Sequence, residues 1–216
     1  MKTDELIEML STNVAVERRD PGGFLRVLLL VVAACILFSL TASSAWLGIR
    51  TEVDPAGQQP FLALKIGFCL IVIALALGCL DRAARPGASR HADWLVLLMP
   101  FGIIFALAGL SLGLAPASHW QAMMVGDRWL SCLISIPIIE VVPFAAIFWT
   151  VRRFAAPTDL TQAGAVAGMI AGAVSAVGYA IHCVDDSIPF VALWYGGTIV
   201  GSTAAGAVLG RTFLRW

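Results

Sequence analysis

The stretch "TQAGAVAGMIAGAVSAVGYAIH" (residues 161–182) decides the fold, because it is long enough to cross a bilayer and almost free of polar side chains. Three of its glycines stand four residues apart: Gly164, Gly168 and Gly172. The next apolar run, residues 189–210, repeats this spacing in two pairs, Gly197 with Gly201 and Gly206 with Gly210. Such stripes let helix backbones approach closely. We therefore predict that both runs are core helices of one subunit, with a homodimer face as the alternative use of the glycines.

Composition identifies the class of protein. Of the 216 residues, 59% are hydrophobic and 13% are charged, and the mean hydropathy is +0.88. A bilayer core about 30 Å thick needs roughly 20 apolar helical residues per span. Six runs have that length: 25–48, 61–80, 94–114, 129–151, 161–182 and 189–210. No segment alternates apolar and polar residues as a barrel strand would, so the sequence predicts an all-α integral membrane protein with six transmembrane helices.

Positive charge predicts the orientation of these helices. Eleven basic residues flank one side of the predicted spans: Lys2, Arg18, Arg19, Arg26, Arg82, Arg85, Arg90, Arg152, Arg153, Arg211 and Arg215. The other side has Arg50 and Arg128, with Lys65 just inside the second span. Because basic loops stay in the cytoplasm, both termini are expected there. The balance of 14 basic and 14 acidic residues gives no argument for direct binding of nucleic acid.

The stretch "YAIHCVDDSIPF" (residues 179–190) then lies at the outer surface and gathers His182, Cys183, Asp185 and Asp186. Cys132 begins the preceding span at a matching depth. The path inward from Cys132 to residue 151 is 19 residues, and the path outward from residue 161 to Cys183 is 22, a difference of about 5 Å at helical rise. We expect the two thiols to meet, exposed, at the outer surface.

Three uses of these thiols remain open. Redox or metal sensing would involve Cys132 and Cys183 together with His182, Asp185 and Asp186, because thiolate and imidazole suit a heavy-metal or zinc-like ion. The spacing matches no compact zinc signature, and as metal ligands we name only Cys132, Cys183 and His182. A structural disulfide is the second use, and unpaired thiols are the third.

The remaining cysteines and one buried acid have simpler interpretations. Cys35, Cys69 and Cys79 lie within spans and are expected to pack as small apolar side chains. Glu140 stands between Pro137 and Pro143 in the fourth span. An acid at this depth indicates either an ion path in a transporter or a brace in a kinked helix. No internal repeat of the transporter type is visible.

Residues 1–23 form a separate cytoplasmic segment. Thr3 can cap a short helix whose first turn carries Asp4 and Glu5. Its apolar stripe consists of Leu6, Met9 and Leu10, continued at residue 13 or 14. A helix this short is marginal alone in water, and its acidic first half does not suit a membrane surface. We therefore predict that these residues bind a protein partner.

Three stretches resemble one known family. They are "MKTDELIEML" (1–10), "RRFAAPTDLTQAGAVAGMIAGAVSAVGYAIHCVDDSIPFVALWYGGT" (152–198) and "GRTFLRW" (210–216). They are similar to the NrsF family of bacterial inner-membrane anti-sigma factors, which are negative regulators of an extracytoplasmic-function (ECF) sigma factor. The resemblance implies six helices, a cytoplasmic N-terminal segment that holds the sigma factor inactive, and a signal sensed by paired cysteines. Cys132 and Cys183 match those cysteine positions, and the other three match none.

The predicted protein is a non-enzymatic regulator in the bacterial inner membrane, with a partner-binding segment at 1–23 and a six-helix domain at 24–216. No catalytic constellation or phosphate-binding loop argues for an enzyme. The alternative is a small transporter or metal-handling permease built around Glu140 and the Cys183 cluster. The two differ in one test, because a regulator loses its function without residues 1–20 and a transporter keeps most of its own.

Overall fold

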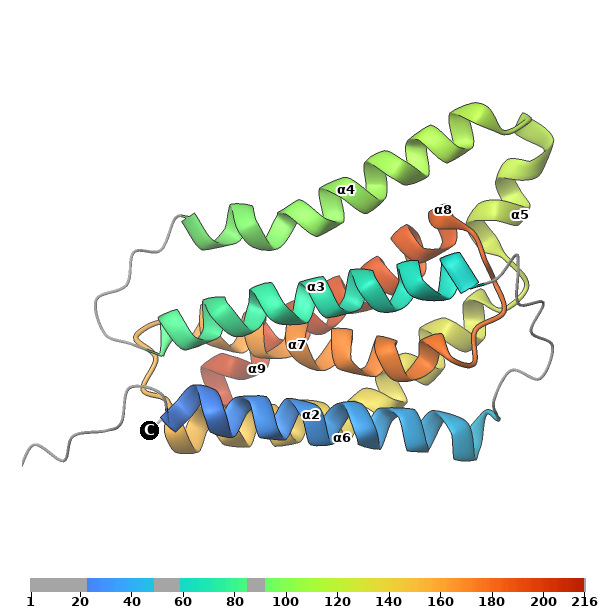
Figure 1. The fold of residues 1–216 in the computed structure, drawn as a ribbon. Helices are drawn as coiled ribbons and strands as arrows, with labels where there is room; N and C mark the ends of the chain where they lie inside the picture. Colours follow the sequence, from blue (N-terminus) through green and yellow to red (C-terminus); the bar gives the residue numbers. More distant parts are fainter. Residues whose placement is uncertain (1–22, 49–58, 85–91, 216) are drawn as a thin grey trace, which may run out of the picture.

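The computed structural model describes residues 23–48, 59–84 and 92–215, and all regular structure in these ranges is helical. Six helical segments there are long and apolar enough to cross a membrane, as the six apolar runs predicted. The long helices are α2 (Gly23–Trp46), α3 (Gln59–Ala83), α4 (Ala92–Leu114), α6 (Trp129–Phe154), α7 (Leu160–Ala180) and α9 (Gly196–Phe213). Figure 1 shows them as an elongated bundle. The partner-binding residues Asp4, Glu5, Leu6, Met9 and Leu10 lie outside the described ranges.

Short helical pieces join the long helices at one end of the bundle. The 3₁₀ turn η1 (Ala117–His119) and α5 (Trp120–Val125) connect α4 to α6, where the sequence indicated only a loop. The three-residue α8 (Ile188–Phe190) and a single π-helical turn, η2 (Val191–Tyr195), lead without a break into α9. A π turn inside a helix is uncommon and often lies at a functional site.

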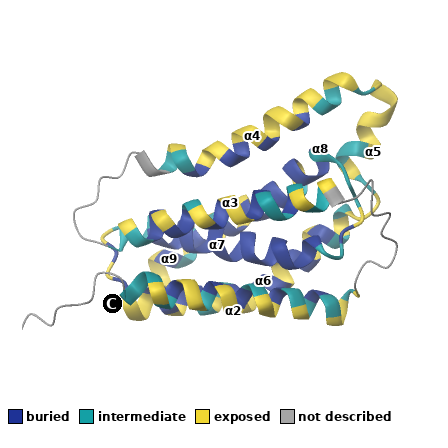
Figure 2. Ribbon diagram, in the orientation of Figure 1, coloured by how far each residue is buried: buried dark blue, intermediate teal, exposed yellow. Residues whose placement is uncertain are grey.

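Helix α7 is the centre of the bundle. Every residue of α7 after its first turn is buried, and the helix contacts α2, α3, α6 and α9. Figure 2 shows α7 as an almost continuously buried ribbon among partly exposed helices. The composition explains this position, because alanine and glycine leave room for neighbours on all sides of a helix. Asp159 begins α7 by accepting hydrogen bonds from the backbone amides of Thr161 (3.0 Å) and Gln162 (3.1 Å).

Glycine allows α7 and α9 to pack backbone to backbone. A Cβ atom added at Gly168 would lie 2.3 Å from the Ser202 carbonyl oxygen, and one added at Gly206 would lie 2.3 Å from the Gly164 carbonyl oxygen. Packing within one subunit, predicted from the glycine spacing, is therefore confirmed for these residues. The prediction is wrong for Gly197 and Gly201, whose added Cβ atoms would meet nothing within 4 Å.

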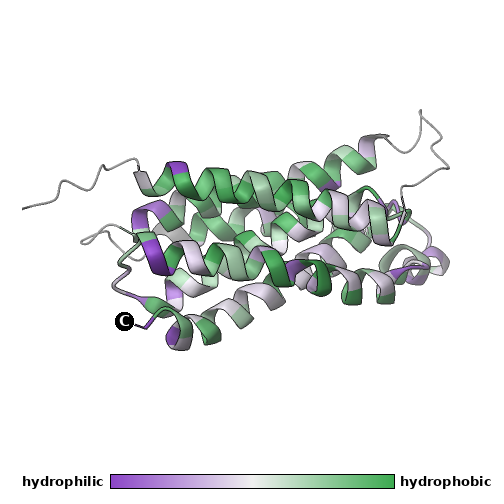
Figure 3. Ribbon diagram, turned by 90° about the horizontal axis from the view of Figure 1, so that it is seen from below, coloured by the Kyte–Doolittle hydropathy of each residue, from purple (hydrophilic) through white to green (hydrophobic). Residues whose placement is uncertain are grey.

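The outside of the bundle is apolar. Large apolar side chains are exposed on most of the long helices, for example Leu30 on α2, Ile71 on α3, Leu95 on α4, Val141 on α6 and Val208 on α9. Figure 3 shows hydrophobic residues along the middle of the bundle and hydrophilic ones towards its two ends. Exposure of this extent is unusual for a protein surrounded by water, and it suits a surface that faces lipid chains.

Candidate functional site

The polar residues that follow α7 contribute one member of a buried ion pair. Lys65, near the start of α3, has no exposed side-chain surface and donates hydrogen bonds from Nζ to Asp186 Oδ1 at 2.9 Å and to the Cys183 carbonyl oxygen at 3.2 Å. The Asp186 side chain is 15% exposed. A buried ammonium is stable only with such partners. This contact of Lys65 was not predicted from the sequence, although a lone lysine within an apolar run signals a nearby acid.

Cys132 and Cys183 lie beside this pair. Cys132 is in the first turn of α6 and Cys183 directly follows α7, and both Cys183 and Lys65 are close enough to Cys132 to act on it electrostatically. No disulfide joins them in this structure. The expectation that they are exposed is wrong, since Cys132 is 0% and Cys183 1% exposed. Tyr195 of η2 lies beside Cys183, a neighbour that helix depth alone does not reveal.

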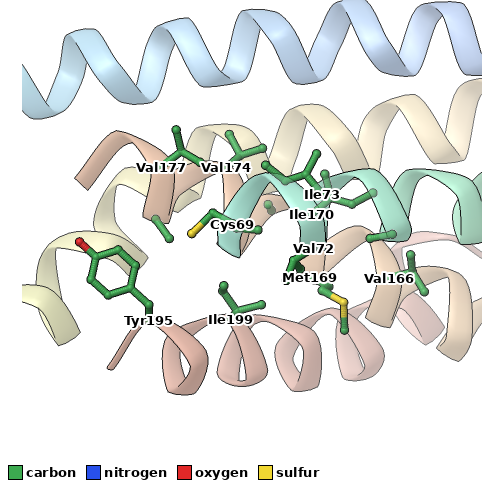
Figure 4. Packing of buried hydrophobic residues seen from close by; sticks show 14 of the residues in the cluster. Cys69, Val72, Ile73, Val166, Met169, Ile170, Val174, Val177, Tyr195 and Ile199 are labelled. Carbon is green, nitrogen blue, oxygen red and sulfur yellow. The ribbon is translucent and has the colours of Figure 1, made fainter. Parts of the chain in front are cut away.

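Two tyrosines and a third cysteine complete what we call the thiol cluster. Its members are Cys69, Cys132, Cys183, Tyr179 and Tyr195. Both tyrosine hydroxyls are buried, and the Tyr195 hydroxyl lies beside the Cys183 thiol. Figure 4 shows Cys69 and Tyr195 within the core formed by α3, α7 and α9. Cys69 was predicted to be a simple packing residue, and the structure places it one helical turn from Lys65, next to the other thiols.

The remaining polar residues that follow α7 bind other elements. Nδ1 of His182 lies 3.1 Å from the Gly48 carbonyl oxygen, just after α2. The Asp185 carboxylate accepts hydrogen bonds from the backbone amides of Asp127 (3.1 Å) and Arg128 (3.0 Å), at the start of α6. Ser187 Oγ donates to the Met123 carbonyl oxygen at 2.6 Å, in α5.

Residues 182–187 therefore act as a latch, the name we use for this segment. Its members reach the end of α2, the start of α3, α5 and the start of α6, which are all elements that meet at one end of the bundle. Gly126 has φ +62°, and a Cβ atom there would lie 2.8 Å from Asp185 Cγ, so only glycine fits beside the latch. The polar residues thus hold these neighbouring elements together, in addition to any sensing role.

The predicted metal ligands are not gathered into one site. Across the described ranges, no group of three histidine, cysteine, aspartate or glutamate side chains is arranged to hold a metal ion. His182 is directed to Gly48 instead of towards Cys132 and Cys183. The three predicted donors do not fit a metal without rearrangement of the latch.

Burial also governs the reactivity of the Cys183 thiol. Burial raises the pKa of the Cys183 thiol, and the Lys65 ammonium counteracts this shift. The thiol is the less reactive form, because the thiolate is the nucleophile and the metal ligand. Cys183 can therefore react quickly only after its surroundings open or after a reagent reaches the buried thiol.

Glu140 belongs to a different part of the molecule. Its side chain is 6% exposed, and Oε2 lies 2.6 Å from the Ser202 hydroxyl of α9. It lines a groove of about 770 Å³ between α6 and α9, whose lining includes no member of the thiol cluster. The structure thus does not bring Glu140 and Cys183 together, and a transporter built on both residues as one site is not supported.

Comparison with known proteins gives a consistent result. The family model NrsF, described as negative regulator of sigma F, matches residues 10–216. The chain is 34% identical over 220 residues to a probable anti-sigma-F factor NrsF of Azospira oryzae, and all of both chains is covered. It is 28% identical over 218 residues to the anti-sigma-F factor NrsF of Caulobacter vibrioides, again over all of both chains. No solved structure matches this chain.

Proposed function

The chain belongs to the family of negative regulators of sigma F, and on that premise we propose that it is an anti-sigma factor embedded in the bacterial inner membrane. Its cytoplasmic N-terminal segment holds an ECF sigma factor inactive. A redox or metal signal at Cys132 and Cys183 releases that sigma factor. The family is regulatory, so no catalytic step is part of the proposal.

Bilayer insertion is supported by the surface of the bundle. Six segments of sufficient length and hydropathy are present in the described ranges, and their outward faces carry large apolar side chains. An even number of spans places both termini on one side of a membrane. The basic residues at the end where α2 begins and α9 ends favour the cytoplasm for that side.

Thiol sensing is supported by the position of Cys183 within the latch, and this observation carries the proposal. The Cys183 carbonyl oxygen accepts a hydrogen bond from Lys65, which also binds Asp186. A two-electron oxidant that converts the two thiols to a disulfide releases two protons and brings the sulfurs to about 2.05 Å. Cys183 must move for this bond to form, and the Lys65 contacts move with it. A soft metal ion bound by both thiolates would act on the same residues.

Helix α2 offers a route from the latch to the partner-binding segment. Its end is held by His182 through Gly48, and its middle lies directly against α7, where a Cβ atom at Gly178 would be 2.6 Å from the Ser39 carbonyl oxygen. Its start at Gly23 follows the N-terminal segment in the chain. A displacement of the latch would therefore shift α2 as a rigid element and change how residues 1–22 are presented.

A reporter gene driven by the sigma factor tests this function. Cys132→Ser, Cys183→Ser and the double variant should all stop responding to the inducing oxidant or metal, and the double variant should behave like either single one, because two residues that form one bond are not additive. Cys35→Ser and Cys79→Ser are matched controls, since both remove a buried thiol outside the thiol cluster. A normal response of the double variant would refute the sensing role.

The second test separates regulation from transport. Removal of residues 1–20 should abolish repression by a protein that still inserts into membranes, because the proposed partner contact lies in that segment. Unchanged repression by the truncated protein would contradict the anti-sigma mechanism proposed here. The transporter alternative retains support only from Glu140 and its groove.

A further inference from the structure

An apolar groove and an arginine-lined pocket join at one end of the bundle. The groove of about 770 Å³ runs between α6 and α9, and most of its lining is apolar, including Pro137, Phe144, Phe148 and Leu209. The pocket, of about 490 Å³, is lined by Trp149, Arg152, Arg153 and Arg215. Trp149 and Arg152 belong to both linings, so the two hollows are continuous.

The groove exists because the two glycine pairs of α9 lie on different faces of the helix, and only one of these faces packs against α7. Gly206 and Gly210 pack against α7, whereas added Cβ atoms at Gly197 and Gly201 would meet nothing within 4 Å. Gly197, Gly201 and Ala205 all line the groove. The absence of side chains on this face leaves a hollow that neither α6 nor α7 fills.

The three arginines carry charge that the described part of the chain does not neutralise. No carboxylate lines their pocket, and within the described ranges none of the three forms a salt bridge. Two basic residues elsewhere have polar partners: Lys65 binds Asp186, and Arg211 donates from Nε to Thr161 Oγ1 at 2.9 Å. Guanidinium groups bind phosphate oxygens in a bidentate manner. The pocket therefore fits an anionic phosphate group.

We propose that this site binds an anionic phospholipid. The phosphate lies between Arg152, Arg153 and Arg215, Trp149 lies at the interface between head group and chains, and one acyl chain occupies the groove alongside α6 and α9. The groove continues past Glu140, so the chain covers the Glu140–Ser202 contact. Basic pockets between helices at a membrane surface are known binding sites for lipid head groups. The proposal rests on the bilayer insertion proposed above, but not on sigma-factor binding.

The apolar groove and the arginine-lined pocket together determine which kind of ligand fits the site. A free phosphate ion would bind the arginines and leave the apolar groove wet. An acyl chain with a phosphate at its end satisfies both. The groove also lies on a surface that faces outward from helices long enough to cross a membrane, where lipid is the surrounding solvent.

Native mass spectrometry of the delipidated full-length protein in detergent tests the site. We expect dioleoyl phosphatidylglycerol to be retained at lower concentration than dioleoyl phosphatidylcholine. Arg152→Gln, Arg153→Gln and Arg215→Gln together should lower phosphatidylglycerol affinity by roughly tenfold or more, given the usual contribution of basic residues near anionic lipid. The matched control is the triple variant Arg26→Gln, Arg82→Gln and Arg211→Gln, which removes the same charge from exposed positions outside the pocket.

A second variant fills the groove without a change of charge. Gly201→Phe places a large side chain in the space where an acyl chain would lie and should also weaken phosphatidylglycerol binding. Gly109→Phe on α4 is its control, because an added Cβ atom there likewise meets nothing within 4 Å. Circular dichroism and the unfolding temperature show whether each variant is folded. The groove variant tests the site even where the triple arginine variant does not fold.

Four results would overturn the proposal. They are equal retention of the two lipids, equal loss in both triple variants, displacement of bound lipid by inorganic phosphate, and a protein dimer that Gly201→Phe abolishes. The third would indicate a phosphate ion site, and the fourth a second copy of the chain. Carbonate extraction of membranes tests insertion separately, and the sigma-factor reporter tests regulation, so failure of the lipid site is distinguishable from failure of the proposed function.

Discussion

Lys65 and Asp186 form an ion pair whose two members differ in burial. Lys65 is fully buried, and Asp186 retains 15% exposure. Removal of one member of a buried pair leaves the other without a counter-charge, and the cost depends on how well water can reach the remaining group. The two single substitutions are therefore not equivalent.

We expect Asp186→Asn to destabilise the protein by about 3–5 kcal/mol, because it leaves a buried ammonium unpaired. Lys65→Met should cost less, since water can reach the remaining carboxylate. The double variant should recover much of the stability lost in Asp186→Asn. Chemical unfolding in detergent measures all three. Equal losses in both single variants, with additive loss in the double variant, would contradict the pairing.

Burial of the Cys183 thiol predicts how the folding stability and the alkylation rate of the protein depend on pH. Because burial raises its pKa in the folded protein, deprotonation is harder in the folded than in the unfolded state. Folding stability is therefore highest below the ordinary thiol pKa of about 8.5 and decreases as pH rises above it. In a Cys132→Ser background, alkylation of Cys183 should be slow at pH 7 and still accelerate above pH 9. A rate that reaches its plateau near pH 8 would indicate an activated thiol.

The long helices show how much of the fold could be predicted from the sequence. Long apolar runs predicted all six spans, because a bilayer imposes one length on every helix. Glycine spacing predicted the α7–α9 contact but grouped both pairs on α9. Gly201 and Gly206 are five residues apart, which rotates the second pair by about 140° around the helix. The two pairs therefore face different directions, and only one of them meets α7.

Other features of the site depend on which helices are neighbours. The contact between Lys65 and Asp186 joins residues 121 positions apart, and no periodicity in the sequence links α3 to the latch. Tyr195, which lies beside the buried Cys183, belongs to the π-helical turn η2, and no pattern in the sequence indicates that turn. The proximity of Cys132 and Cys183 could be predicted because depth along two consecutive helices follows from residue counts alone.

The α7–α9 contact can be tested with one added methyl group. Gly168→Ala should destabilise the protein by about 1–3 kcal/mol, the usual cost of overpacking, because its Cβ atom would lie 2.3 Å from the Ser202 carbonyl oxygen. Gly201→Ala on the open face of α9 should be neutral or slightly stabilising, since alanine favours helix over glycine. Unfolding in detergent compares the two. Equal stability of both variants would show that α7 and α9 do not pack in this way.

At the scale of the whole molecule, the bundle separates two ends with different tasks. The latch and the thiol cluster lie where α7 ends and α3 and α6 begin, while α2 begins and α9 ends at the opposite end (Figure 1). Under the proposed function, a signal at the end with the thiol cluster must reach a partner bound at the opposite end. The proposed connection is mechanical, through α2 and α7, and it requires that residues 1–22 bind the partner directly.

Leu6→Glu or Leu10→Glu should therefore abolish partner binding and repression while the protein inserts normally. A charge placed in an apolar groove of the partner without a counter-ion costs several kcal/mol, comparable to the contribution of a main contact residue. Ser11→Glu is the matched control, because it adds the same charge on the opposite face of the predicted helix. Co-purification of the sigma factor with each variant measures binding, and a reporter gene measures repression. Loss of binding in all three variants would indicate that charge alone, and not the apolar stripe, governs the contact; retained binding in both leucine variants would place the partner contact elsewhere in the chain.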